Sequence, residues 1–501
     1  MTNLSLNLSE AAGMYPDRKA IRMDDHVLTF AALDDAASRA ASMLRAHGLR
    51  PGDRLGLMLP NVPAFAILYY GALRAGGVVV PMNPLLKSRE VAYYLDDCRA
   101  ELLCGWHEVA AEAEIGAKAA GAQWLPVLPV EFDDLVAGFE PFADVVSCQP
   151  EDSAVILYTS GTTGKPKGAE LTHGGLNRNQ AITGGTLLHV GPEDVVMGCL
   201  PLFHVFGMTV GLNLAVAGGA CLTLIPRFDP GKALEVIARD KVTIFEGVPT
   251  MYAAMLGHRH RASYDVASLR VCVSGGAALP LEVLRGFEEA FGCMILEGYG
   301  LSETSPVASF NHPDRERKPG SIGTPIEGVE MRLVDLGRNE VAAGEVGEIE
   351  IRGHNLMKGY WGKPDETSAA IRDGWFSTGD LARVDDDGYF YIVDRKKDLI
   401  IRGGYNVYPR EVEEVLYEHP AVGEAAVVGM PHDSLGEEIG AAVALKDQAT
   451  ASPEELVDFV RQRLAAYKYP RRVWLVDSLP KGPTGKILRR QVIPPAVVDH
   501  S

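Results

Sequence analysis

Short apolar runs alternate along much of the chain with stretches whose apolar residues recur at helical spacing. The runs at 54–60, 76–82, 154–160, 242–248 and 269–276 contain few polar positions. Uninterrupted runs are typical of strands covered on both faces, as in parallel sheets flanked by helices. The pattern therefore predicts an α/β fold. Several runs end in Gly or Ser, and turns at the carboxyl ends of strands usually bind the ligand in such folds.

The hydrophobic pattern changes beyond about residue 320. Segments 347–353 and 387–404 are β-rich and lie next to GG or DDDG turns, which predicts hairpins. Two helical patterns then alternate with short strands, which favours a small α+β domain. We expect a large N-terminal domain of several lobes, residues 1–396, and a small C-terminal domain, residues 397–501.

One uncharged stretch, residues 206–225, has the length of a membrane span. It contains Thr209, Asn213 and Thr223, and Gly218-Gly219 interrupts it. A membrane helix requires about 20 continuous apolar residues. We therefore predict a buried helix, a glycine turn and a buried strand, and no transmembrane segment.

Length, charge and cysteine content narrow the class of function. A chain of 501 residues is too long for one core, and its composition is that of a globular protein. The net charge of −18 argues against general binding to nucleic acid or anionic membranes, so local donors would have to hold an anionic ligand. The seven cysteines form no CxxC pair, and the N-terminus has no signal-peptide pattern, so we expect a cytoplasmic protein.

The segment 158–168, YTSGTTGKPKG, is unusually dense in glycine, hydroxyl and lysine residues, and it follows an apolar strand. Glycines let successive backbone N–H groups turn toward one anion, while hydroxyls and lysines add donors. The segment therefore predicts a phosphate-binding loop. It lacks the spacing of a Walker A motif, and a lone glycine-rich loop would more often be an ordinary turn.

The whole string closely resembles the phosphate-loop signature of the adenylate-forming superfamily. This family includes acyl-CoA synthetases, among them medium- and long-chain fatty acid–CoA ligases, as well as peptide-synthetase adenylation domains and luciferases. Further segments resemble the family's motifs, in the same order, over nearly the whole chain. They are the acid-pocket motif 201–204, the adenine and magnesium motif 298–304, the ribose motif 377–380, the hinge 394–398, the thiol-tunnel loop 403–404 and the catalytic-lysine motif 481–486.

The resemblance implies a site for ATP and Mg²⁺. Glu303 and Thr162 would ligate the metal, and one carboxylate suffices because Mg²⁺ usually takes only one or two from the protein. Taken alone, Glu303 would more readily be a helix-start acid, Asp380 a turn residue and Arg395 a solvated charge. The predicted ATP-binding residues are Thr159, Ser160, Gly161, Thr162, Thr163, Gly164, Lys165, Gly298, Tyr299, Gly300, Thr304, Asp380, Arg395 and Lys486.

The resemblance also assigns catalytic roles. His204 would position the bound acid and support the transition state without proton transfer, because attack by a carboxylate needs no base. Lys486 would bridge the acid and the α-phosphate and stabilise charge at the pentavalent centre. Taken alone, His204 would more often be a core residue, and Lys486 a surface lysine. The predicted catalytic residues are Lys486, His204, Glu303 and Thr162, and the predicted acid pocket comprises His204, Phe206, Gly207, Met208, Gly275 and Gly276.

In the family, the reaction has two halves. A carboxylate first attacks the α-phosphate of ATP, giving acyl-AMP and pyrophosphate. The C-terminal domain then rotates about the residue that corresponds to Lys397, which removes Lys486 and brings in Gly403-Gly404. A loop with so little side chain leaves room for the pantetheine arm of coenzyme A. We therefore expect the C-terminal domain to be mobile.

The acid is predicted from the polarity of its pocket. Residues 205–213 contain no Arg, Lys or His, so a second carboxylate would be buried there unpaired, at a cost of roughly several kcal/mol. We expect a monocarboxylic acid with an apolar tail: first a medium- or long-chain fatty acid, then an aryl acid.

Three other functions share part of this pattern. A fatty acyl-AMP ligase would load a carrier protein. Such enzymes carry an insertion before the hinge, and this sequence shows no obvious one, which favours coenzyme A as the acceptor. A luciferase-like oxygenase shares the first half-reaction. A catalytically dead nucleotide-binding module would not need the intact Lys486, Glu303 and Asp380.

Overall fold

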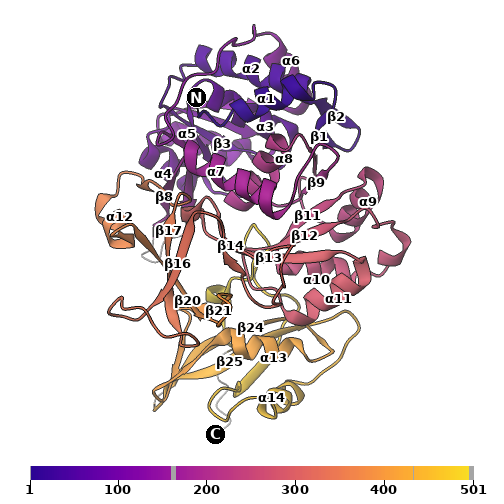
Figure 1. The fold of residues 1–501 in the computed structure, drawn as a ribbon, viewed down its shortest axis with the longest axis vertical. Coiled ribbons are helices and arrows are strands. Elements are labelled where there is room, and N and C mark those ends of the chain that lie inside the picture. The colour runs from indigo at the N-terminus through magenta and orange to yellow at the C-terminus, as the bar shows by residue number, and fades with distance from the viewer. Residues whose placement is uncertain (1, 160–164, 433, 496–501) are drawn as a thin grey trace.

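The computed structural model describes residues 2–159, 165–432 and 434–495 (Figure 1). A seven-stranded sheet lies in its N-terminal part, in the order β18-β8-β7-β4-β3-β5-β6, and is parallel from β7 to β6. Its strands are β3 (Arg54–Met58), β4 (Val78–Pro81), β5 (Leu102–Trp106), β6 (Gln123–Val127), β7 (Ser153–Thr159), β8 (Lys167–Thr172) and β18 (Gly359–Tyr360). The helices that accompany it are α2 (Phe30–Ala46), α3 (Pro63–Arg74), α4 (Ser88–Cys98), α5 (Ala110–Ala119) and α6 (Pro129–Ala137).

A nine-stranded sheet follows, with the order β15-β14-β13-β12-β11-β9-β10-β1-β2 and a parallel centre. Its strands are β1 (Lys19–Met23), β2 (His26–Thr29), β9 (Val195–Gly198), β10 (Cys221–Leu224), β11 (Ile244–Gly247), β12 (Val271–Ser274), β13 (Met294–Gly300), β14 (Val307–Phe310) and β15 (Thr324–Pro325). Its helical elements are α1 (Leu6–Met14), α7 (His173–Ile182), the π-helix η3 (Gly207–Asn213), α8 (Leu214–Ala217), α9 (Pro230–Asp240), α10 (Pro249–Gly257) and α11 (Leu281–Phe291).

Two five-stranded sheets complete the chain. The first is antiparallel and holds β16 (Val329–Val334), β17 (Gly347–Gly353), β19 (Ile371–Arg372), β20 (Trp375–Val384) and β21 (Phe390–Arg395), with α12 (Pro364–Ala370) nearby. The second belongs to the C-terminal part, with strands β22 (Ile400–Arg402), β23 (Tyr405–Val407), β24 (Val422–His432), β25 (Gly436–Leu445) and β26 (Arg472–Leu475) and helices α13 (Pro409–Tyr417) and α14 (Pro453–Arg461).

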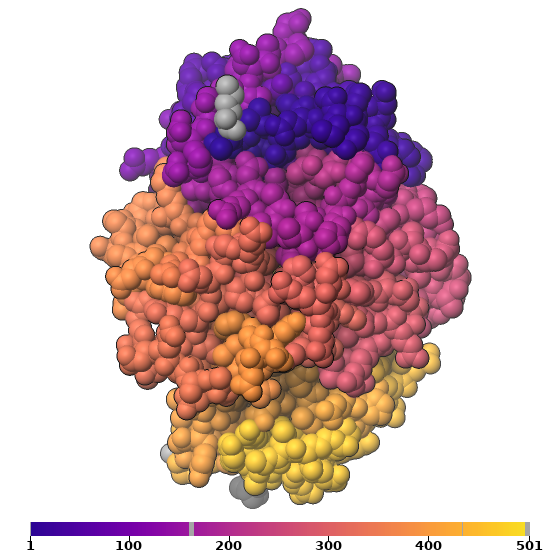
Figure 2. All heavy atoms as spheres, viewed as in Figure 1, coloured from indigo at the N-terminus to yellow at the C-terminus, as the bar shows by residue number. Residues whose placement is uncertain are grey.

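The C-terminal part has a hydrophobic core of its own. Buried side chains from Leu4 to Phe390 form one large cluster and a smaller second one, whereas those from Ile400 to Val473 form a separate cluster. Figures 1 and 2 place this part at the opposite end of the molecule from the N-terminal helices. The predicted fold class, a large α/β domain followed by a smaller C-terminal domain, is confirmed, and the boundary after residue 396 and the mobility stay predictions.

Local sequence signals set the ends of the elements. Helix α14 starts with a reciprocal capping box between Ser452 and Glu455 and has Pro453 in its first turn. Helix α11 ends at Gly292, whose φ of 64° is the left-handed conformation that glycine adopts without strain. Short, fully buried strands such as β4 and β12 correspond to the apolar runs of the sequence.

The uncharged stretch 206–225 has the predicted form. It contains η3 and α8, then Gly218 and Gly219 at a turn, then the buried strand β10. Within the part of the chain that the structure describes, none of the helices combines the length and apolar character needed to cross a membrane.

Replacing Phe287 by Ala should lower the free energy of unfolding by about 3–5 kcal/mol. Its ring is fully buried in α11, stacks on Phe291 at 3.8 Å and meets Tyr252 edge-on at 4.9 Å. Chemical denaturation of the variant measures the loss. Val130→Ala, at a side chain that is 75% exposed, is the control and should change the value by less than about 0.5 kcal/mol. Equal effects at the two positions would contradict this packing.

Candidate active site

A cavity of about 1720 Å³ lies where β7, β11, β12 and β13 end and where the C-terminal domain meets the larger part. Pockets for one small molecule are typically about 300–1,000 Å³, so this one has room for more than one ligand. It brings together most of the predicted site residues that the structure describes. These are Thr159, His204, Phe206, Gly275, Gly276, Gly298, Tyr299, Gly300, Glu303, Asp380, Arg395, Lys397 and Lys486.

Other predicted site residues lie elsewhere. Met208 is fully buried and packs in the core, and a Cβ at Gly207 would come within 2.5 Å of the Pro201 carbonyl, so this glycine serves close packing. Lys165 is exposed, near the ring of Tyr93. Thr304 is buried below the cavity, and Gly403 and Gly404 form an exposed turn outside it. The predicted residues Ser160, Gly161, Thr162, Thr163 and Gly164 fall outside the described residues.

Three residues from separate motifs form one polar group in the cavity. The Tyr299 hydroxyl donates a hydrogen bond to Asp380 Oδ2 at 2.6 Å, and Arg395 Nε pairs with Asp380 Oδ1 at 3.2 Å. Burial and the nearby Asp380 charge raise the pKa of Tyr299 well above its ordinary value, so this hydroxyl keeps its proton. The antiparallel pairing of β20 with β21 sets Asp380 directly opposite Arg395. The two residues predicted to hold a ribose are therefore adjacent.

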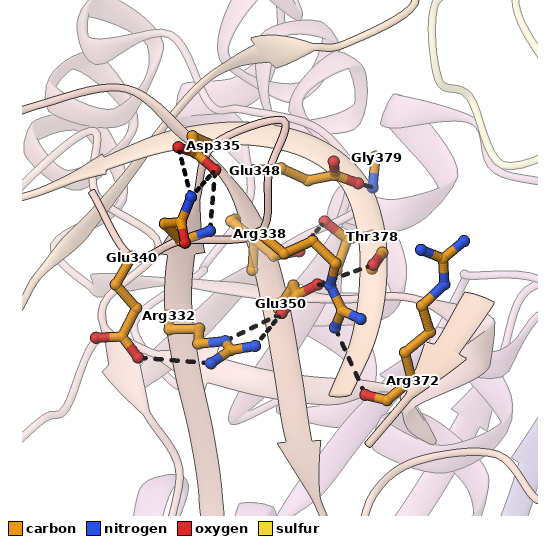
Figure 3. A network of polar contacts seen from close by, with 12 residues as sticks. Arg332, Asp335, Arg338, Glu340, Glu348, Glu350, Arg372, Thr378 and Gly379 are labelled. Carbon is orange, nitrogen blue, oxygen red and sulfur yellow. Dashed lines mark hydrogen bonds and ion pairs between the residues drawn. The ribbon is translucent and has the colours of Figure 1, made fainter. Parts of the chain in front are cut away.

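Two carboxylates of β17 accept hydrogen bonds from the ribose motif, residues 377–380 (Figure 3). Ser377 Oγ donates to Glu350 Oε1 at 3.1 Å, and the Gly379 N–H donates to Glu348 Oε1 at 3.0 Å. Glu350 is fully buried, and although burial would raise its pKa, hydrogen bonds from Arg338 and Arg332 hold that pKa below its ordinary value. Both glutamates lie in the segment GEIEIRG, residues 347–353. Their role could not be predicted, because the residues that bind them lie outside this segment and no sequence motif links them to it.

Glu303 lies in a short 3-10 turn (Ser302–Thr304) and is mostly buried. Thr159 Oγ1 and the Tyr360 hydroxyl both donate to its Oε1, at 3.2 and 3.1 Å. Tyr360, on β18, is a site residue that no sequence motif identifies. Among the described residues, no group of three or more His, Cys, Asp or Glu could hold a metal. One positioned carboxylate fits Mg²⁺, which keeps several waters and binds substrate phosphates.

His204 and Lys486 come from distant parts of the chain, and both line the cavity. Thr250 Oγ1 donates to the Gly485 carbonyl at 2.8 Å, which holds the loop that carries Lys486 against α10. Burial, assisted by the charge of Arg395, lowers the pKa of Lys486 to about 8. Burial and then the Lys486 charge lower the pKa of His204 to about 4. The Phe206 N–H donates to His204 Nδ1 at 3.2 Å, so the neutral ring carries its proton on Nε2.

Comparisons with known proteins identify the family of this chain. The family model for an AMP-binding enzyme matches residues 8–361, and that for its C-terminal domain matches 411–486. A long-chain-fatty-acid–CoA ligase of Bacillus subtilis (strain 168) is 40% identical, over 98% of this chain and 94% of its own length. A feruloyl-CoA synthase of an Amycolatopsis species is 39% identical, over 96% of each chain. An anthranilate–CoA ligase crystallised with anthranoyl-AMP has a TM-score of 0.93 at 31% identity, over 97% of this chain and 96% of that one.

His204 should stay neutral between about pH 5.5 and 8, because burial and the Lys486 charge disfavour its protonated form. Lys486→Ala removes the nearby positive charge and should move the pKa of His204 upward, yet leave it below the ordinary value. NMR of the protein with labelled histidine measures both, and His204→Asn assigns the signal. A His204 signal that titrates with an ordinary midpoint in the unmodified protein would contradict this geometry.

Proposed function

We propose, since the chain belongs to the family of AMP-binding enzymes, that it is an ATP-dependent, AMP-forming ligase that joins a monocarboxylic acid to coenzyme A. The observation that carries the proposal is the meeting of His204, Glu303, the Asp380–Arg395 pair and Lys486 in one cavity. Together these residues offer a carboxylate that can accept hydrogen bonds from a ribose, a carboxylate that can ligate a metal ion, and a cation beside the reacting acid and phosphate.

The nucleotide lies, in this proposal, beside the end of β13 and the middle of β20. Asp380 accepts hydrogen bonds from the ribose hydroxyls, and Tyr299 and Arg395 hold its carboxylate in place. Glu303 would hold Mg²⁺, and Thr162, which lies outside the described residues, would be the second protein ligand. When bound, Mg²⁺ neutralises phosphate charge and so favours departure of pyrophosphate.

The first half-reaction depends on bringing two anions together. The Lys486 ammonium lines the same cavity as His204 and Asp380, and in this proposal it stabilises the charge that builds up on the α-phosphate. His204 donates from Nε2 to the acid's carboxylate and orients it, without taking a proton. The carboxylate oxygen forms the new bond to phosphorus, and the bond to pyrophosphate breaks.

The second half-reaction requires the C-terminal domain to move. Gly403 and Gly404 belong to the same domain as Lys486, but they lie outside the cavity while Lys486 lies inside it. A rotation about Lys397 exchanges the two, and the thiol of coenzyme A then attacks the acyl carbonyl as AMP leaves. A carrier protein is the weaker alternative as acceptor.

The location that we propose for the protein is the cytoplasm, because all seven cysteines are free thiols.

The acid is a medium- or long-chain fatty acid, with an aryl acid as the alternative. The part of the cavity beyond His204 is lined by Phe206, Val210, Val248 and Val273, which suits an apolar body. A Cβ at Gly275 would meet the Phe206 ring at 3.0 Å, so glycine at this position keeps the pocket wall thin. Named relatives include ligases for both a fatty and an aryl acid.

Acyl-CoA formation is tested by AMP release with and without coenzyme A, across acetate, malonate, octanoate, palmitate and benzoate. Octanoate or palmitate should release AMP only when coenzyme A is present. Lys486→Ala should reduce adenylate formation about 10²–10³-fold, because it removes a charge that stabilises the transition state. Lys118→Ala, at a side chain on the outer helix α5, is the matched control. Pyrophosphate exchange without thioester would point to a carrier protein, and no exchange with any acid would defeat the proposal.

The rate should also report the charge of Lys486. Since its pKa in the free protein is about 8, kcat/KM of adenylate formation should fall as pH rises above about 8, where the ammonium is lost. Lys486→Arg keeps its charge in this range and should show no such fall, whatever its absolute rate. An alkaline fall of the same size and midpoint in Lys486→Arg would assign it to another group.

A further inference from the structure

Tyr360 connects the carboxylate of Glu303 to the strand that follows the predicted phosphate loop. Its hydroxyl lies 3.1 Å from Glu303 Oε1, and both residues line the cavity. A carboxylate can only accept hydrogen bonds, and a phenol ordinarily keeps its proton up to about pH 10, so Tyr360 is the donor at neutral pH. Strand β18, which carries Tyr360, pairs with β8 and sets this residue opposite Ala169.

The position of the Tyr360 ring is set by the backbone around it. The Tyr360 N–H donates to Thr367 Oγ1 at 2.9 Å, and the next residue, Trp361, donates its N–H to the Gly168 carbonyl at 2.8 Å. The ammonium of Lys167 on β8 lies 5.1 Å from the centre of the ring. Because β8 and α12 hold Tyr360, its hydroxyl has a fixed place to which the carboxylate must adjust.

The hydroxyl donors to Glu303 meet at one of its two oxygens. Thr159 Oγ1 donates to Oε1 at 3.2 Å, and Tyr360 donates to the same atom. The Met357 N–H donates to the backbone carbonyl of Glu303 at 2.8 Å, which holds the turn itself. A carboxylate oxygen offers about two lone-pair sites, so both sites of Oε1 are occupied. Oε2, which accepts no hydrogen bond from the residues that the structure describes, is the oxygen left for a cation.

We propose that Tyr360 is a positioning residue that makes Glu303 a one-oxygen ligand and so gives the metal site a preference for Mg²⁺ over Ca²⁺. The inference rests on the proposed function, in which Glu303 ligates the cation. Mg²⁺ requires near-ideal octahedral geometry and keeps several waters, which a single fixed oxygen suits. Ca²⁺ takes more ligands and binds carboxylates through one or both oxygens, so releasing Oε1 would favour Ca²⁺.

The test measures how much each metal ion tightens the binding of α,β-methylene-ATP, an analogue that cannot release pyrophosphate. Calorimetry gives the dissociation constant without metal and with saturating Mg²⁺ or Ca²⁺, and the ratio of the two constants is the gain for that metal. By linkage, this gain equals the metal affinity that the protein adds to that of the free nucleotide. In the unmodified protein, the gain with Mg²⁺ should exceed the gain with Ca²⁺ at least about tenfold.

Tyr360→Phe should reduce this preference at least about fivefold, because losing a hydrogen bond to a metal-ligating carboxylate typically weakens metal binding about 10–100-fold. The dissociation constant without metal should stay within about twofold, since Tyr360 acts only through the cation. Tyr391→Phe is the matched control. The Tyr391 hydroxyl also donates to a carboxylate, Asp385 Oδ2 at 3.2 Å, but neither residue lines the cavity, so the preference should be unchanged.

Equal gains from Mg²⁺ and Ca²⁺ in the unmodified protein would overturn the inference even if Tyr360→Phe failed to fold. So would a preference that Tyr360→Phe leaves intact, or a loss of binding that is equally large without metal. Glu303→Gln separates these outcomes from a failure of the proposed function, because it should remove most of the gain with Mg²⁺. A gain with Mg²⁺ that Glu303→Gln leaves intact would reject both the metal role of Glu303 and the inference built on it.

Discussion

The burial of the Lys486 ammonium between the two domains is the interaction on which the active arrangement depends. The protein carries a net charge of −18, and both an acid and ATP are anions, so the overall field repels them. A local cation must offset this repulsion. Burial of Lys486 and the positive charge of the nearby Arg395 both disfavour its ammonium form and lower its pKa to about 8. An anion placed beside Lys486 relieves both penalties, so ligand binding and docking of the C-terminal loop stabilise each other.

The buried Glu350 supports the nucleotide side of the cavity from the strand next to it. Glu350 is bound by two arginines and holds the strand that presents Asp380, so it acts on the site through structure alone.

Much of the fold follows from the sequence because buried parallel strands are short and apolar. The runs at 54–60, 76–82 and 269–276 became β3, β4 and β12, and the change beyond about residue 320 marks the antiparallel part. The nucleotide side was also predictable, since its residues lie in contiguous motifs. Tyr360 and Glu350 were not, because each acts through partners distant in the sequence. Gly207 and Met208 were predicted to line the acid pocket but pack away from the cavity, which only the π-helical geometry of η3 reveals.

A crystal structure with a stable acyl-adenylate mimic, in which a sulfamate replaces the phosphate, tests most directly whether the cavity is an adenylate site. The ribose hydroxyls should bind Asp380, the sulfamate should lie beside Lys486, and the acyl group should extend past His204 toward Val210 and Val273. A mimic bound with its ribose away from Asp380, or a saturating mimic that leaves the cavity empty, would contradict the adenylate-forming function.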